Sequence, residues 1–212
     1  MIVGTNAAEA AALVTEIIGP TLNASAYTEI IRLVFGSAAG LIEYAYPVSD
    51  YKSAWWALEA ILTDALFVCP ARRSVRWFSK YNIPSYLYSF SHTPSVTVVP
   101  KCTAPCHTTE LPYVFHVQPL LANKAESELS NTVVQYWSSF ANNLVPKSEN
   151  QPSWPQYMRL LDRSIDLNIT ISVTSGLRMK TCNFWDVVQK FMPSDEFIRI
   201  STNLMARLRK SE

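Results

Sequence analysis

The feature that most constrains the fold is a short aromatic segment between two prolines. Residues 85–90 read Ser-Tyr-Leu-Tyr-Ser-Phe, with Pro84 before them and Pro94 shortly after. A run of this length and composition, bounded in this way, predicts a β-strand. Met1–Val3 predicts another buried strand that enters a turn at residues 4–6, and Ile165–Val173 predicts a short strand pair.

The segments between these strands carry apolar residues at helical spacing. In residues 53–67 the apolar side chains cover much of the helix circumference, which predicts burial on more than one side. We expect Cys69-Pro70 to interrupt this helix before it resumes over residues 71–80. The same spacing predicts helices over residues 7–18, 27–35, 41–45, 126–142, 181–191 and 197–209. Helices that separate short strands indicate a layered α/β fold.

Composition excludes several classes of partner. The 212 residues have a formal net charge of +1, and the 18 basic residues are not massed in one run. We therefore expect no binding to nucleic acid. The basic residues of the last predicted helix (Arg199, Arg207, Arg209 and Lys210) are interpreted as a solvated face. No uninterrupted apolar run approaches the ~18 residues that span a bilayer, so no membrane span is predicted.

The cysteines favour disulfides over a metal site. There are four, Cys69, Cys102, Cys106 and Cys182, with no CxxC pair and no zinc-finger spacing to histidine. An even number is compatible with disulfides and an oxidising compartment. Two Asn-x-Ser/Thr sequons, at Asn23 and Asn168, are compatible with glycosylation in a secreted protein.

The N-terminal segment does not resemble a signal peptide. It lacks a basic region, and Glu9 lies where the apolar region of a signal should be. Instead the sequence begins directly with a predicted strand. We therefore expect the chain to be the C-terminal part of a longer protein, with any signal peptide upstream.

Two titratable residues follow predicted strands. Glu9 follows the first strand, and His107 lies beyond the strand at residues 86–90. In layered α/β folds the active groups lie on loops beyond the carboxyl ends of strands. Because the unperturbed pKa of histidine is near neutral, His107 is the first candidate for a general base. A histidine that only caps or packs is the alternative.

Several motifs, in one consistent order along the whole chain, resemble the type-B carboxylesterases, which include the cholinesterases. The resemblance covers residues 1–212 but less than half of a typical family member, its C-terminal portion. The motifs are Gly4-Thr5-Asn6-Ala7-Ala8-Glu9, Asp64-Ala65-Leu66-Phe67-Val68-Cys69-Pro70, Tyr86-Leu87-Tyr88-Ser89-Phe90, His107-Thr108-Thr109-Glu110-Leu111-Pro112-Tyr113-Val114-Phe115, Trp137-Ser138-Ser139-Phe140-Ala141, Trp154-Pro155-Gln156-Tyr157 and Cys182-Asn183-Phe184-Trp185. The resemblance implies an α/β-hydrolase fold and hydrolysis of small carboxylic esters without a cofactor.

The family's catalytic triad runs in the order Ser, Glu or Asp, His. By resemblance, Glu9 is the acid, His107 is the base, and Glu110 is a buried partner rather than a proton donor. Cys69 and Cys182 resemble the family's disulfide partners, and their bond would stabilise the fold by roughly 4–5 kcal/mol in the chain-entropy model. Cys102 and Cys106 form a tight disulfide beside His107 or remain free.

The nucleophile is the missing member of the triad. The nearest approach to Gly-x-Ser-x-Gly is Gly36-Ser37-Ala38-Ala39-Gly40, where the serine is misplaced and the flanks are helical. We therefore expect the chain alone to hydrolyse nothing. Three residues replace glycines of the family pattern, namely Ala10, Thr108 and His116, and a side chain at position 108 is expected to crowd the imidazole loop.

The substrate and the function have alternatives. Residues 11–13 lack the aromatic rings that would line a choline-binding gorge, which favours a general carboxylesterase. A non-catalytic adhesion or structural protein on the same scaffold is the alternative, and a truncated pseudoenzyme is a third. Retention of both Glu9 and His107 favours the enzyme, because an adhesion protein has no chemical need of either.

Overall fold

The computed structural model describes residues 1–191, so the helix predicted over residues 197–209 and its basic face lie outside the described residues. The strands are β1 Ile2–Asn6, β2 Tyr86–Phe90, β3 Arg163–Leu167 and β4 Ser172–Ser175. The α-helices are α1 Ala11–Ile18, α2 Ala24–Phe35, α3 Ala39–Ala45, α4 Ala54–Thr63, α5 Cys69–Lys80, α6 Leu111–Val114, α7 Lys124–Asn143 and α8 Met179–Phe191. A π-helical turn, η3, spans Asp64–Val68.

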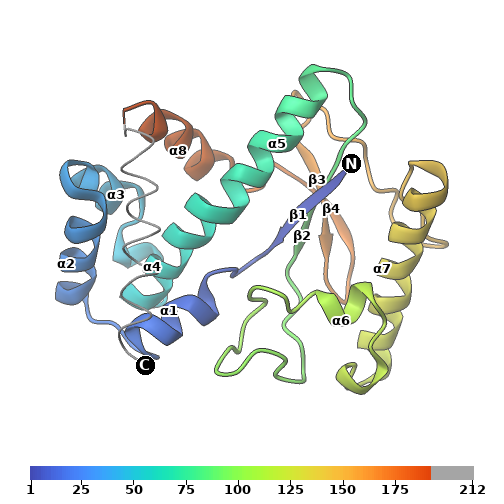
Figure 1. Cartoon of the computed structure of the whole chain (residues 1–212), viewed down its shortest axis with the longest axis horizontal. Helices are drawn as coiled ribbons and strands as arrows, with labels where there is room; N and C mark the ends of the chain where they lie inside the picture. The colour runs from blue at the N-terminus through green and yellow to red at the C-terminus, as the bar shows by residue number, and fades with distance from the viewer. Residues whose placement is uncertain (192–212) are drawn as a thin grey trace.

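The four strands form one mixed sheet in the order β1-β2-β3-β4. The pairs β1–β2 and β2–β3 are parallel, and β3–β4 is antiparallel. Helices cover the sheet on two sides, with α5 crossing one side and α7 standing on the other (Figure 1). This arrangement is the layered α/β fold that the alternation of helices and strands predicts.

The alternating side chains of β2 explain how one strand serves two layers. Tyr86 and Phe90 pack with Tyr136 of α7 in one apolar cluster, whereas Leu87 packs with Val75 of α5 in another. A third cluster packs helices α1, α2, α3 and α4 against α8 in a separate helical region (Figure 1). The core therefore consists of two layers on the sheet and one helical lobe beside it.

The N-terminal strand is longer than the sequence predicts. Gly4 was expected in a turn, but it lies inside β1 opposite Tyr88. A Cβ atom at position 4 would lie 2.2 Å from the Tyr88 ring, so only glycine lets this ring cross β1. The strand continues to Asn6, and α1 begins at Ala11 rather than at residue 7.

The expected interruption at Cys69-Pro70 is wrong. Helices α4 and α5 are joined by η3 into one continuous helix, Ala54–Lys80, of 27 residues. The wider π-turn closes a bond from the Cys69 amide to the Asp64 carbonyl, and Pro70, which has no amide proton, fits in the first turn of α5. The helix continues through a local change of pitch instead of ending.

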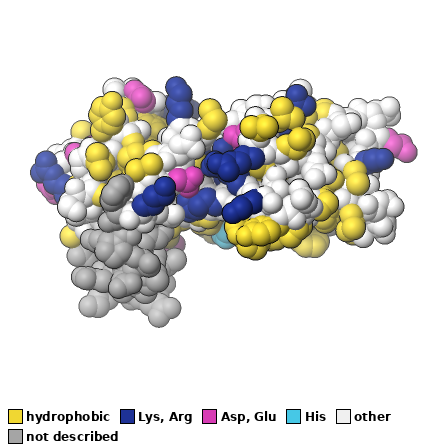
Figure 2. All heavy atoms as spheres, turned by 90° about the horizontal axis from the view of Figure 1, so that it is seen from above, with side chains coloured by type: hydrophobic (Ala, Val, Ile, Leu, Met, Phe, Trp, Pro, Cys, Tyr) yellow, Lys and Arg dark blue, Asp and Glu magenta, His cyan; other side chains and the backbone are white. Residues whose placement is uncertain are grey.

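Among residues 1–191, this joined helix alone is long and apolar enough to pass a length-and-composition test for membrane spans. In its most apolar stretch, 72% is buried inside the protein. Cys69 at its centre forms a disulfide with Cys182 of α8, and Arg73 and Arg76 pair with Asp186 at 3.1 and 3.3 Å. These contacts make it a core helix. Basic and acidic side chains lie side by side on the face of the protein seen in Figure 2.

Candidate active site

Glu9 and His107 meet beyond the carboxyl ends of β1 and β2. His107 Nδ1 lies 2.8 Å from Glu9 Oε2, although the two residues are 98 positions apart in sequence. The backbones of their loops are also joined, by the His107 amide to the Glu9 carbonyl at 3.3 Å and by the Ala8 amide to the Pro105 carbonyl at 3.0 Å. The parallel β1–β2 pairing delivers both loops to one edge of the sheet.

The Glu9 carboxylate is buried, with 7% of the residue exposed. This burial raises its pKa, while the Asn6 amide, 2.7 Å from Oε1, and the His107 ring oppose the rise. The charge of Glu110 adds a further upward push to the pKa. The pair therefore consists of a desolvated carboxyl whose ionised form depends on its two hydrogen-bond donors.

The His107 side chain is 63% exposed. One side of its ring packs against Phe67 of η3, with the ring centres 5.4 Å apart. Nδ1 is occupied by Glu9, and Nε2 forms no hydrogen bond with any of residues 1–191. A neutral ring in this setting carries its proton on Nδ1 and leaves the Nε2 lone pair available to a substrate or a neighbouring hydroxyl.

Comparison with known proteins shows the family. The model of the Carboxylesterase family matches residues 23–185. The chain belongs to the carboxylesterase family. The match includes His107 but begins after Glu9, and with the mixed sheet described above it indicates the α/β-hydrolase fold.

Relatives with known activities span much longer chains than the matched region. A medium-chain fatty acyl-CoA hydrolase precursor of Anas platyrhynchos is 32% identical over 173 residues, which is 79% of this chain and 30% of the relative. A cocaine esterase of Oryctolagus cuniculus is 32% identical over 150 residues, 68% of this chain and 28% of the relative. An acylcarnitine hydrolase of Mus musculus is 30% identical over 149 residues, 68% of this chain and 26% of the relative. This carboxylesterase-family chain thus spans less than a third of each of these relatives.

Of the three positions where the resemblance leads us to expect glycine, two have glycine-like backbones. Thr108 has φ +75° and His116 has φ +50°, both in the left-handed region. Ala10, with φ −83°, does not need glycine. The loop around His107 therefore keeps a conformation suited to glycine while carrying a β-branched threonine, which strains the backbone.

The remaining residues singled out in the sequence lie in different places. Glu110 is half-buried and accepts a hydrogen bond from Asn6 Nδ2 at 2.5 Å. Asn23 is exposed and caps α2 through its side-chain oxygen, whereas Asn168 is half-buried and its amide nitrogen donates to Ser91 at 3.0 Å. Glycosylation at both positions stays a prediction, with Asn23 the more accessible of the two.

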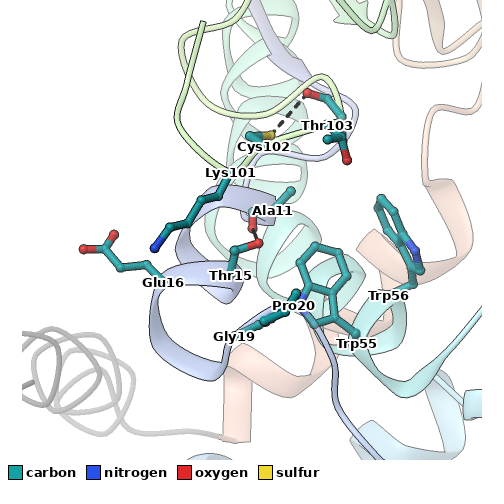
Figure 3. Close-up of a pocket in the computed structure, with 11 residues that line it drawn as sticks. Ala11, Thr15, Glu16, Gly19, Pro20, Trp55, Trp56, Lys101, Cys102 and Thr103 are labelled. Atoms are coloured by element: carbon teal, nitrogen blue, oxygen red, sulfur yellow. Dashed lines mark hydrogen bonds between the residues drawn. The ribbon is translucent and has the colours of Figure 1, made fainter. Parts of the chain in front are cut away.

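The second cysteine pair, Cys102 and Cys106, is also disulfide-bonded in the structure. It closes a small loop directly before His107. Between this loop, α1 and the start of α4 lies an open cavity of about 660 Å³ (Figure 3). The indole rings of Trp55 and Trp56 lie on one side of the cavity, and Glu16 and Lys101 lie on the other (Figure 3). Glu9 and His107 do not line it.

Sequence reasoning missed a second histidine–glutamate pair. His92 Nε2 lies 3.0 Å from Glu126 Oε1, with 11% of the histidine side chain and none of the glutamate side chain exposed. Glu126 also accepts the amides of Ser95 and Ala122, each at 2.7 Å. The sequence predicts the helix that carries Glu126 from its apolar periodicity, but that periodicity indicates packing and gives no sign of a pair with His92. Among the described residues no three His, Cys, Asp or Glu side chains gather into a metal-binding group.

Proposed function

We propose that this chain supplies the acid and the base of a Ser–Glu–His triad that hydrolyses carboxylic esters. The observation that carries the proposal is the Glu9–His107 contact of 2.8 Å, with the opposite nitrogen of a 63% exposed ring unengaged by residues 1–191. A general base requires this arrangement, in which one nitrogen is oriented and the other is accessible.

In the proposed reaction His107 Nε2 takes the proton from a serine hydroxyl as the serine oxygen attacks the ester carbonyl. The resulting imidazolium is stabilised by Glu9, whose ionised carboxylate accepts a hydrogen bond from Nδ1–H throughout. His107 then gives the Nε2 proton to the departing alcohol, which leaves an acyl-serine. A water molecule that is deprotonated by the same nitrogen then attacks the acyl-serine. The bond from the acyl carbon to the serine oxygen breaks, the carboxylic acid leaves, and Nε2 returns the proton to the serine oxygen, which restores the starting state.

We assign the serine to polypeptide outside these 212 residues, which contain no Gly-x-Ser-x-Gly sequence. Ser37, in the nearest approach to that sequence, lies in the 3-10 turn Gly36–Ala38, so it lacks the strand-to-helix elbow that presents a nucleophile. On this proposal residues 1–212 form a partial carboxylesterase domain. The spans of 26–30% of the relatives support a division of the triad between this chain and other sequence.

The substrate class and the location follow from the same residues. We propose a general small-molecule ester over a choline ester, because the residues at the start of α1 (Ala11, Ala12 and Leu13) offer no aromatic face to a quaternary ammonium group. The disulfides Cys69–Cys182 and Cys102–Cys106 support folding in an oxidising secretory compartment.

The test is ester hydrolysis measured in two polypeptides. The purified 212-residue chain should release no nitrophenol from p-nitrophenyl esters above the buffer rate. A longer product of the same gene that contains Gly-x-Ser-x-Gly should hydrolyse them and should lose that activity in His107→Ala. Turnover by the 212-residue chain alone, or full activity of His107→Ala, would overturn the proposal. A gene product that encodes no such serine would favour the non-catalytic scaffold.

A further inference from the structure

Asn6 bonds to both members' segments of the Glu9–His107 pair, through its side chain to the segment of His107 and through its backbone amide to Glu9. It is the last residue of β1, and only 1% of it is exposed. Its side-chain nitrogen lies 2.8 Å from the carbonyl oxygen of Cys106, the residue before His107. The same nitrogen lies 2.5 Å from Glu110 Oε2. Both protons of the amide therefore have acceptors on the segment that carries the base.

The backbone of Asn6 holds the acid. Its amide donates to Glu9 Oε1 at 2.7 Å, while Glu9 Oε2 faces His107. The rotation of the carboxylate is thus fixed by two donors, one on each oxygen. Asn6 contributes to both halves of the pair from a single residue at the end of a strand.

Charge explains why an amide suits this position. Asn6 donates to two carboxylates, to Glu9 from its backbone and to Glu110 from its side chain, and the charge of Glu110 raises the pKa of Glu9. A neutral side chain that donates twice stabilises Glu110 and the Cys106 carbonyl without adding a third negative charge. An aspartate of the same shape would lose both donated bonds and repel both neighbours.

We propose that Asn6 is a positioning residue, which sets the distance and the orientation between Glu9 and His107. Without its side chain the Cys106 carbonyl and Glu110 lose their shared donor. The segment that carries His107 then keeps its two backbone bonds to residues 8 and 9 but loses its side-chain bonds to the end of β1, which lets His107 shift relative to Glu9. A displacement of about 1 Å in a catalytic arrangement costs about 10²-fold in rate. The proposal rests on the proposed function only for this consequence, because the geometry itself exists without a nucleophile.

The experiment reads the ring nitrogens of His107 by ¹⁵N NMR in the 212-residue chain, where no turnover is needed. In the wild type we expect a protonated Nδ1 that exchanges slowly and a bare Nε2. Asn6→Ala and the isosteric Asn6→Asp should both lose the slowly exchanging Nδ1 proton and show a mixture of the two ring tautomers. The matched control is Asn131→Asp, an exposed position on α7, which should retain the wild-type signals.

His92 serves as an internal reporter of folding, because its bond to Glu126 involves neither Asn6 nor the residues to which Asn6 is hydrogen-bonded in these contacts, namely Glu9, Cys106 and Glu110. The proposal predicts loss of the His107 signal while the His92 signal persists. Retention of the His107 signal in both Asn6 variants would overturn it. Simultaneous loss of the His92 signal would also overturn it, since Asn6 would then maintain the whole fold rather than the pair. An active longer protein should in addition show a kcat that falls about 10²-fold with KM unchanged.

Discussion

Residues 1–191 contain two histidine–glutamate pairs that have nearly equal distances but differ in the exposure of the ring. In the first, Glu9 meets Nδ1 of His107 at 2.8 Å, and the ring is 63% exposed. In the second, Glu126 meets Nε2 of His92 at 3.0 Å, and the ring is 11% exposed. A short distance between a carboxylate and an imidazole therefore does not identify a catalytic pair.

What separates the two pairs is the environment of each carboxylate. Burial alone would raise the pKa of Glu126, but hydrogen bonds from His92, Ser95 and Ala122 lower it to about 2. Glu9 has fewer donors, and burial raises its pKa. Glu126 is thus satisfied within the structure, whereas Glu9 faces a ring that is open to solvent, where on the proposed function it would stabilise the positive charge formed in the reaction.

The largest expected difference between the pairs is in catalysis. In a longer, active form of the protein, Glu9→Gln should lower kcat by about 10⁴-fold, because the amide no longer selects the Nδ1–H tautomer. Glu126→Gln should leave kcat within a few-fold of the wild type. Steady-state hydrolysis of a nitrophenyl ester at equal concentrations of folded protein measures both. Equal losses in the two variants would remove the distinction.

For stability, we expect the larger effect from Glu126→Gln rather than from Glu9→Gln. At pH 7, Glu126→Gln should lower the free energy of unfolding by about 3 kcal/mol, the value of a pKa lowered from 4.5 to about 2. Glu9→Gln should leave the free energy of unfolding unchanged or raise it, because the folded state disfavours the ionised form of Glu9. Glu128→Gln, which removes an exposed partner of Lys124 on the same helix, is the control and should change it by about 0.5 kcal/mol or less. Guanidinium unfolding compares the three variants.

Acid should weaken the second pair within a defined range. The unfolded chain protonates Glu126 near its ordinary pKa of 4.5, whereas the folded protein does so only near pH 2. The stabilisation is therefore complete above pH 4.5 and is lost as the pH falls toward 2. The free energy of unfolding, measured at successive pH values, should change less over this range in Glu126→Gln than in the wild type. An identical acid dependence would place the sensitive group elsewhere.

The smallest expected effect concerns backbone strain, which lies beside the first pair. Thr108, next to His107, has φ +75°. Thr108→Gly should therefore raise the free energy of unfolding by about 1 kcal/mol. Thr103→Gly, in the same loop but without a positive φ, should be neutral or destabilising. In thermal unfolding the Tm of Thr108→Gly should rise, whereas that of Thr103→Gly should stay or fall. Destabilisation of Thr108→Gly would show that the threonine side chain contributes contacts that outweigh the strain.

The sequence allowed prediction of what is encoded locally. The strand at residues 86–90 follows from its aromatic alternation, and its parallel partner β1 from an apolar start. The meeting of Glu9 and His107 follows from two loops that leave adjacent strands on the same side. By contrast, the Asn6 side chain has acceptors 100 and 104 residues away, and His92 and Glu126 are 34 residues apart. Such contacts depend on how whole segments pack, and no short-range pattern carries them.

The continuous helix Ala54–Lys80 is a case in which a local sequence rule gave a wrong prediction. Pro70 was expected to end a helix because it has no amide proton, which is correct for an α-helical interior. The π-turn at Asp64–Val68 adds a residue before the proline and moves it into the first turn of α5, where that proton is not needed. The missing amide proton of Pro70 was therefore interpreted correctly, but the preceding π-turn allows the helix to continue.

The most direct test of the account is the protonation of the two rings in the wild-type chain at neutral pH. A ¹⁵N NMR spectrum of the histidine side chains distinguishes the tautomers. The account predicts opposite tautomers, with the proton of neutral His107 on Nδ1 and that of neutral His92 on Nε2, since each faces its carboxylate through that nitrogen. A proton on Nε2 of His107, or rapid averaging between its nitrogens, would contradict the assignment of Glu9 and His107 as an acid–base pair.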